Sequence, residues 1–162
     1  MNPLQSICVA LLIAAGASSG CRDNGSTLET LAAFSQSNRS VLASLVSDIQ
    51  KQTSLSRIIW SDGREFVTVI YRDGRVVDGY SDDKKWQPEI SNWVGRLKAA
   101  GCHGFDDRKS VTCLYLSMET FIAVPSDDLR TEYAGWAEKD SNRDGYRCKD
   151  LGQGWYLTTE KN

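Results

Sequence analysis

Apolar residues between Thr27 and Lys51 recur at intervals of three and four positions, which is the spacing of one helix face. The apolar positions of this segment are Leu28, Leu31, Phe34, Val41, Leu42, Leu45, Val46 and Ile49. Polar residues at 35–40 interrupt them, so the segment is predicted to form either one helix or two. A helix face of this kind packs against a core, and a helix that docks a partner is the alternative.

Three segments that follow are rich in β-branched and aromatic residues, and Asp-Gly pairs separate them. They span 56–60, 65–71 and 75–80, with the pairs at 62–63 and 73–74. Asp-Gly favours the tight turn of a hairpin because glycine accepts the positive φ that the turn requires. The pattern therefore predicts a three-stranded antiparallel meander.

The second half of the chain alternates between helix and strand signals. Pro88 suits the first position of a helix, and Gly101 suits the position after its last turn. The remaining predicted elements are a strand pair near 111–117 and 120–124, a short helix with Ser126 as N-cap, and a last strand at 154–159.

These elements predict the fold class. We expect one α+β domain over residues 27–162, in which an N-terminal helix or helix pair packs on an antiparallel sheet. The sheet contains the three-stranded meander and a C-terminal strand, and one helix lies centrally in the chain.

Composition and charge limit the partners. The chain has 162 residues, of which 41% are apolar and 25% are charged, as in an ordinary soluble domain. Its 19 basic residues are spread among 21 acidic ones, so no basic face follows a phosphate backbone. We therefore expect no nucleic-acid partner.

The first residues have the features of an export signal. Residues 1–20 carry no charged side chain, and they contain an apolar run at 7–17. This run is too short to span a bilayer but suits the core of a signal peptide. Residues 1–20 are therefore predicted to be removed.

The end of this segment resembles the lipobox of bacterial lipoproteins. Ser19 and Gly20 precede Cys21 as small residues precede the lipidated cysteine of that family, whereas Ser18 stands where the family usually has leucine. The resemblance implies palmitate or a related acyl chain on Cys21 and a short tether over 21–26.

The resemblance also implies a location. A lipid on Cys21 would anchor the protein to a membrane of the cell envelope, facing the periplasm. Arg22 is not the aspartate that tends to retain lipoproteins in the inner membrane of enteric bacteria, which favours the outer membrane. Cleavage without lipidation is the alternative, and it would give a secreted or soluble periplasmic protein.

Export places the remaining cysteines in an oxidising compartment, where thiols pair. Cys102 ends a predicted helix and Cys113 lies early in a predicted strand, with a short loop between them. We therefore predict a Cys102–Cys113 disulfide. If Cys21 is lipidated, Cys148 has no such partner, and if it is not, a Cys21–Cys148 bridge becomes the alternative.

A calcium loop is the second resemblance. Asp140, Asn142 and Asp144 alternate before a glycine, and the carbonyl of Tyr146 offers a further oxygen. This run resembles the first half of an EF-hand loop and the loop of excalibur-type extracellular domains, which implies calcium as the one cofactor. Leu151 stands where the EF-hand has a bidentate glutamate. A polar turn built from Asp, Asn and Gly is the alternative.

Candidate ligand-binding and catalytic groups are few. Trp86 lies among charged residues, where it is either an exposed anchor for a ligand or an edge of the core. The adjacent carboxylates at 82–83, 106–107 and 127–128 are typical of solvated turns and helix starts. The chain has no phosphate-binding loop, no nucleophile elbow and no H-E-x-x-H sequence.

These observations predict a non-enzymatic envelope lipoprotein that binds a protein or cell-wall ligand at the membrane surface. One alternative is a calcium-stabilised secreted or periplasmic domain. The other is a hydrolase of cell-wall glycans, whose carboxylates would be assembled in space rather than in sequence.

Overall fold

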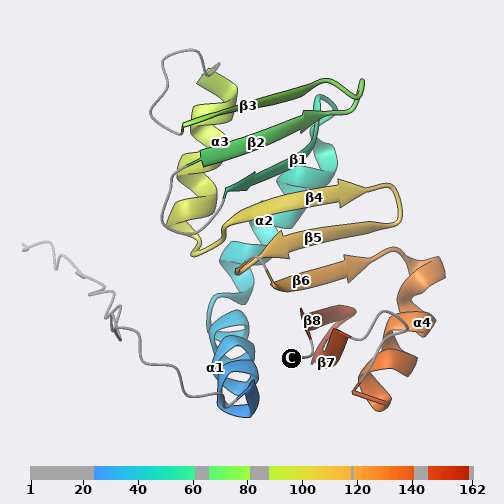
Figure 1. The fold of residues 1–162 in the computed structure, drawn as a ribbon. Helices are drawn as coiled ribbons and strands as arrows, with labels where there is room; N and C mark the ends of the chain where they lie inside the picture. The colour runs from blue at the N-terminus through green and yellow to red at the C-terminus, as the bar shows by residue number, and fades with distance from the viewer. Residues whose placement is uncertain (1–23, 61–65, 81–87, 118, 141–145, 161–162) are drawn as a thin grey trace, which may run out of the picture.

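Eight strands form one antiparallel sheet in the order β3-β2-β1-β4-β5-β6-β8-β7, and four helices pack on it (Figure 1). The computed structural model describes residues 24–60, 66–80, 88–117, 119–140 and 146–160, and these counts refer to them. The helices are α1 (Asn24–Ser37), α2 (Arg39–Lys51), α3 (Pro88–Ala99) and α4 (Asp127–Glu138). The strands are β1 (Leu55–Trp60), β2 (Phe66–Tyr71), β3 (Val76–Tyr80), β4 (Gly104–Arg108), β5 (Val111–Tyr115), β6 (Thr120–Pro125), β7 (Tyr146–Gly152) and β8 (Trp155–Glu160). The α+β class predicted from the sequence is confirmed.

The N-terminal helical segment is a pair of helices. α1 and α2 are separate because Asn38 leaves the helical conformation (φ −104°, ψ 15°). Its backbone and side-chain amides both donate to the carbonyl of Phe34, at 3.0 and 2.9 Å, so the end of α1 keeps a hydrogen-bond partner. The buried side of α2 consists of the predicted apolar residues Leu42, Leu45, Val46 and Ile49.

The predicted meander and central helix are present. β1, β2 and β3 are neighbours in the sheet, and the second Asp-Gly pair lies in the turn between β2 and β3, with Gly74 at φ 88°. α3 begins at Pro88 and is closed by Gly101 at φ 71°, after which the amide of Cys102 donates to the carbonyl of Leu97. This is the Schellman type of helix end that the glycine predicts.

The sheet contains two similar units. α2 followed by β1–β2–β3 and α3 followed by β4–β5–β6 each form a helix and a three-stranded meander. The units meet where β1 pairs with β4 in antiparallel register, Ile58 opposite Phe105 and Ile59 opposite Gly104. α4 and the hairpin β7–β8 extend the sheet beyond β6.

Two strands lie in segments that were predicted as loops. β4 follows His103 in the stretch GFDDR, and β7 occupies YRCKDLG after the candidate calcium run. Both segments carry several charges and little apolar alternation, which is why they were interpreted as loops. Their strand structure comes from pairing with β1, β5 and β8 rather than from their own composition.

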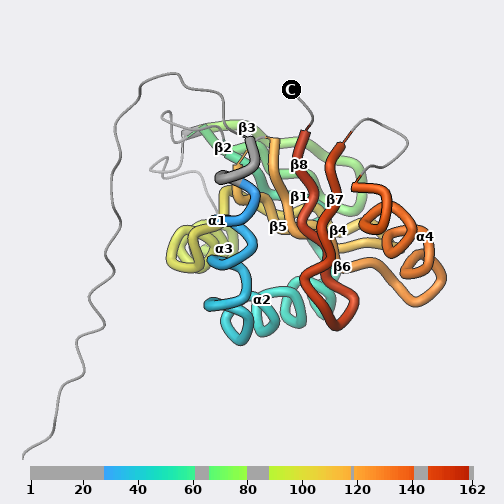
Figure 2. The backbone as a smooth tube through the Cα atoms, turned by 90° about the horizontal axis from the view of Figure 1, so that it is seen from below, coloured from blue at the N-terminus to red at the C-terminus, as the bar shows by residue number. Residues whose placement is uncertain are grey.

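The two faces of the sheet are covered differently. α1, α2 and α3 lie on one face, and α4 lies on the other, beside β6, β8 and β7 (Figures 1 and 2). The main core lies under the three helices and includes Ile58, Val69, Phe105 and Leu114 from the sheet. A smaller core lies under α4, where Tyr133 packs with Cys113, Ala123, Cys148 and Tyr156.

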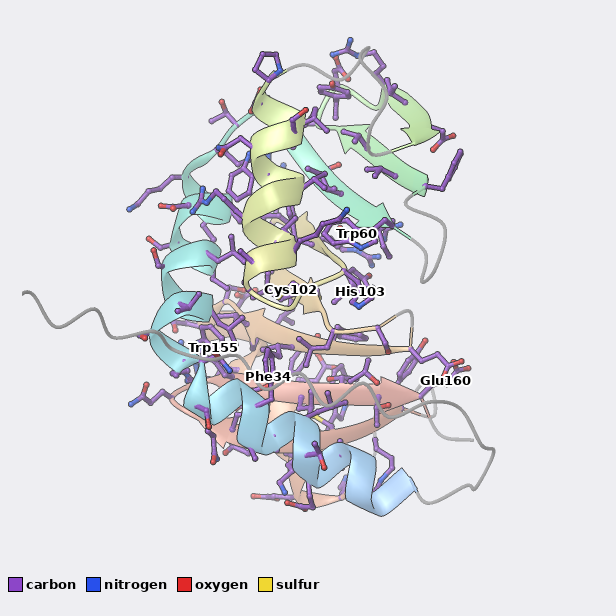
Figure 3. All side chains as sticks on the ribbon, turned by 90° about the vertical axis from the view of Figure 1, so that its left-hand side faces the viewer. Phe34, Trp60, Cys102, His103, Trp155 and Glu160 are labelled. Atoms are coloured by element: carbon purple, nitrogen blue, oxygen red, sulfur yellow. The ribbon has the colours of Figure 1, made fainter. Side chains whose placement is uncertain are left out.

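The predicted disulfide is wrong. Cys102, Cys113 and Cys148 are all buried and all free. Cys102 lies at the end of α3 beside His103, within the main core (Figure 3). Cys113 belongs to the smaller core under α4. The body of the sheet separates the two cores, so the loop that seemed short enough for a local bridge is in fact the strand β4.

The membrane-related predictions concern residues 1–26, which end within the first turn of α1. Residues 1–20, Cys21 and residues 22–23 of the predicted tether lie outside the described residues, whereas residues 24–26 of that tether form the start of α1. Within the described ranges, none of the four helices combines the length and the apolar composition that a bilayer-spanning helix requires.

Candidate binding surface

One half of the second sheet face has no helix over it among the described residues. On β2, Val67 and Val69 point to the main core and are fully buried, whereas Phe66 is 38% exposed and Ile70 is half-buried. On β3, Val76 lies opposite Ile70 and is 54% exposed. We call this surface, formed by the outward side chains of β1, β2, β3 and β4, the open face.

An arginine–aspartate cluster lies on the open face where the two units meet. Arg57 on β1 is directly opposite Asp106 on β4, and its Nη2 donates to the Asp106 carboxylate. Arg108 Nε donates to the same carboxylate oxygen at 3.0 Å, and Arg108 Nη2 forms an ion pair with that oxygen at 3.0 Å. The hydrogen bond and the charge of Asp106 raise the pKa of Arg108 above its usual value, so Arg108 keeps its positive charge at every accessible pH.

A second cluster lies on the other side of β4. Adjacent residues of a strand point to opposite faces, so Asp107 faces away from Asp106. Its carboxylate accepts hydrogen bonds from Arg72 Nη2 and from the hydroxyl of Thr112 (2.8 Å). Gln50 of α2 donates to that hydroxyl at 3.2 Å, which ties the helix to the β4–β5 hairpin.

The solvated-turn interpretation of Asp106 and Asp107 is wrong. Both side chains are buried in β4 and bonded to arginines from β1, from the turn after β2, and from the end of β4 itself. Their partners lie some 35 to 50 residues earlier in the chain or two residues later, so local spacing could not reveal the pairing. The pair at Asp127 and Asp128 does begin a helix, as predicted. Facing opposite sides of the sheet, Asp106 and Asp107 cannot act as a facing pair of glycosidase carboxylates.

Two cavities adjoin these clusters. The first, of about 560 Å³, lies on the open face and is lined by Arg57, Ile70, Arg72, Asp106 and Arg108, among others. The second, of about 440 Å³, lies beside the end of α2 and includes Gln50 and Thr112. Four residues line both cavities: Arg72, Asp107, Arg108 and Lys109. The charged residues at the end of β4 and in the β4–β5 turn therefore line both cavities.

The candidate calcium run is only partly described. Asn142 and Asp144 lie outside the described residues, as does the candidate ligand-binding residue Trp86. Asp140 has φ 47°, and its Oδ2 accepts a hydrogen bond from Arg147 Nε (3.0 Å) and forms an ion pair with Arg147 Nη2 (2.9 Å). Tyr146 is the first residue of β7. Among the described residues, no three His, Cys, Asp or Glu side chains are grouped to hold a metal ion. The calcium site stays a prediction.

The buried thiols are chemically quiet. Burial raises the pKa of Cys102 and of Cys113 to about 12 and that of Cys148 to about 11. Since the thiolate is the reactive form, these cysteines are protonated at neutral pH and pack as small apolar residues. Burial likewise raises the pKa of Tyr133, which belongs to the same small core as Cys113 and Cys148.

The chain matches no protein-family model, no curated protein and no solved structure.

Proposed function

We propose that this chain is a non-enzymatic binding protein of the bacterial cell envelope, which lipid on Cys21 holds at a membrane and which binds a protein ligand on its open face. The observation that carries the proposal is the half of the sheet face that none of the described helices covers (Figure 1). The same strands present fully buried Val67 and Val69 to the main core and leave Phe66 and Val76 exposed on the opposite side.

The composition of the open face favours a protein ligand over a glycan. Exposed apolar side chains that adjoin one another on a folded domain mark interaction sites. Here Ile70 lies opposite Arg57 on one side and Val76 on the other, and Arg72 lines the same cavity as Arg57 and Ile70. Aromatic residues and arginine are the types enriched at the centre of protein interfaces, because they combine apolar area with directed hydrogen bonds.

A photo-cross-linking residue at position 76 tests the proposal in cells that express the full chain. Val41 on α2 provides a matched control, because it is also a valine and is 52% exposed against 54% for Val76. We expect a discrete protein adduct from position 76 and none of the same mass from position 41. The proposal fails if position 76 gives no adduct, or if both positions give the same set of adducts.

The membrane tether has a separate test. The intact mass of protein from the membrane fraction is measured after alkylation in denaturant, once without and once with prior reduction. We expect an acylated chain that begins at Cys21 and carries three alkyl groups in both samples, since the three described cysteines are free. An unacylated chain with only two thiols reactive before reduction would instead support a Cys21–Cys148 bridge and a soluble protein.

A further inference from the structure

The lining of the open-face cavity is positively charged, although the whole chain is not. Four cationic side chains and two carboxylates line it, an excess of two positive charges (4 − 2) on a chain whose formal charge is −2 (19 − 21). The cations are Arg57, Arg72, Arg108 and Lys109, and the carboxylates are Asp106 and Asp107. Such a local excess attracts an anionic group.

The arginines are held in place and still have free donors. Arg57 and Arg72 each contact their aspartate through Nη2, which leaves further N–H groups of each guanidinium for a ligand. Arg57 Nε is buried and donates to no group among the described residues. Arg108 is 66% exposed at its side chain, although its hydrogen bond and its ion pair both involve Asp106. Because the aspartates already fix these side chains, binding requires little further ordering.

Apolar residues continue the same surface. Ile70 lines the cavity beside Arg57, and Val76 lies directly opposite Ile70 on β3. Arg75, in the turn before β3, lies over the Tyr71 ring at 3.9 Å from its centroid. A small inorganic anion would use the arginines and leave the valine and isoleucine exposed. A protein segment that carries both carboxylates and aliphatic side chains would use both parts of the surface.

We infer that the partner on the open face contributes an acidic segment, whose carboxylates bind Arg57, Arg72 and Arg108 while its aliphatic side chains cover Ile70 and Val76. This inference rests on the binding function proposed above and adds the chemistry of the partner. Arginine suits the role because its planar guanidinium binds a carboxylate through two parallel hydrogen bonds.

Fluorescence anisotropy with two labelled octapeptides tests the inference on the full chain, purified from membranes in a non-ionic detergent. One peptide alternates valine with glutamate, and the other alternates valine with glutamine. We expect the glutamate peptide to bind at least tenfold more tightly, and its affinity to fall when salt rises from about 50 to about 300 mM, because salt screens exposed charges. Equal affinities of the two peptides would overturn the inference.

Two arginine variants locate the effect. Arg108→Gln removes one cavity cation, and we expect it to weaken glutamate-peptide binding at least fivefold. Arg130→Gln is the matched control, because Arg130 on α4 is 54% exposed at its side chain and is also paired with an aspartate. We expect Arg130→Gln to stay within twofold of the parent. Equal effects of the two variants would contradict a role for the cavity.

The cross-link from position 76 separates this inference from the proposed function. We expect Arg108→Gln, but not Arg130→Gln, to reduce the adduct. If the adduct persists in Arg108→Gln, the open face binds a partner but the inference that this partner is acidic is contradicted. If the parent protein gives no adduct, the proposed binding function itself is contradicted. If the protein binds inorganic polyphosphate but not the glutamate peptide, and Arg108→Gln weakens polyphosphate binding, the arginines bind a phosphate polymer and the inference is overturned.

Discussion

Gly104 determines whether the two units of the sheet can join. It lies between Ile59 of β1 and Tyr115 of β5, and its φ is +152°, in a region that side-chain-bearing residues rarely adopt. A Cβ at this position would lie 2.2 Å from the carbonyl oxygen of Ile58 and 2.7 Å from the Cα of Ile59. Both atoms belong to the backbone of β1, so no side-chain rotation can relieve the overlap.

We therefore expect Gly104→Ala to destabilise the domain substantially. The backbone conformation costs about 1–3 kcal/mol for a residue with a side chain. Forcing the strands apart adds about 1–3 kcal/mol, as overpacking does elsewhere. A combined loss of about 3 kcal/mol would lower the melting temperature by roughly 10 °C in a domain of this size.

Thermal and urea unfolding, followed by circular dichroism, measure the effect. Gly135→Ala provides the matched control, because Gly135 lies inside α4 and a Cβ there would meet nothing within 4 Å. The control is expected to gain about 0.5–1 kcal/mol from the higher helix propensity of alanine. The reasoning is refuted if Gly104→Ala unfolds within about 0.5 kcal/mol of the parent, because β1 and β4 would then not approach as closely as described.

Three further predictions follow from burial and charge. Asp107→Ala should lose about 2–3 kcal/mol of unfolding free energy in urea titrations, because it leaves Arg72 and the buried hydroxyl of Thr112 without their shared acceptor. Asp127→Ala, which removes a strongly exposed ion pair, should lose less than about 1 kcal/mol. Equal losses would contradict the burial of Asp107 in β4. The three thiols should resist iodoacetamide at pH 8 until the chain is denatured, and fast alkylation of the native protein would show instead that they are accessible. Because the folded pKa values of these thiols are raised above the unfolded value, their contribution to stability should be complete below about pH 9 and lost as the pH rises through 11 to 12. Cys113→Ala should make that loss of stability smaller. If the DSNRDG run binds calcium, millimolar calcium should raise the melting temperature of the parent and not of Asp144→Ala, and no rise in the parent would end that prediction.

Local sequence patterns determined the helices and most of the strands. The helix pair, α3, α4, the first meander and the last strand follow from apolar spacing and from residues with one strong local role, such as Pro88 and Gly101. These signals work because helix ends and tight turns depend on the conformation of a few neighbouring residues, which is fixed by their own chemistry.

The candidate site was decided by the tertiary structure. The two aspartates of β4 are typical of a solvated turn when only the local sequence is considered. In the folded chain they form ion pairs with Arg57 and Arg72, which lie far from them in the sequence. The pairing of the cysteines also depends on the tertiary structure, because Cys102 lies in the core on one face of the sheet and Cys113 in the core on the other. A charge or thiol in a strand is stabilised by whatever lies across the sheet, and pairing between distant strands cannot be read from local spacing. The sequence therefore determined which elements form, whereas the order of the strands decided which side chains meet on the open face.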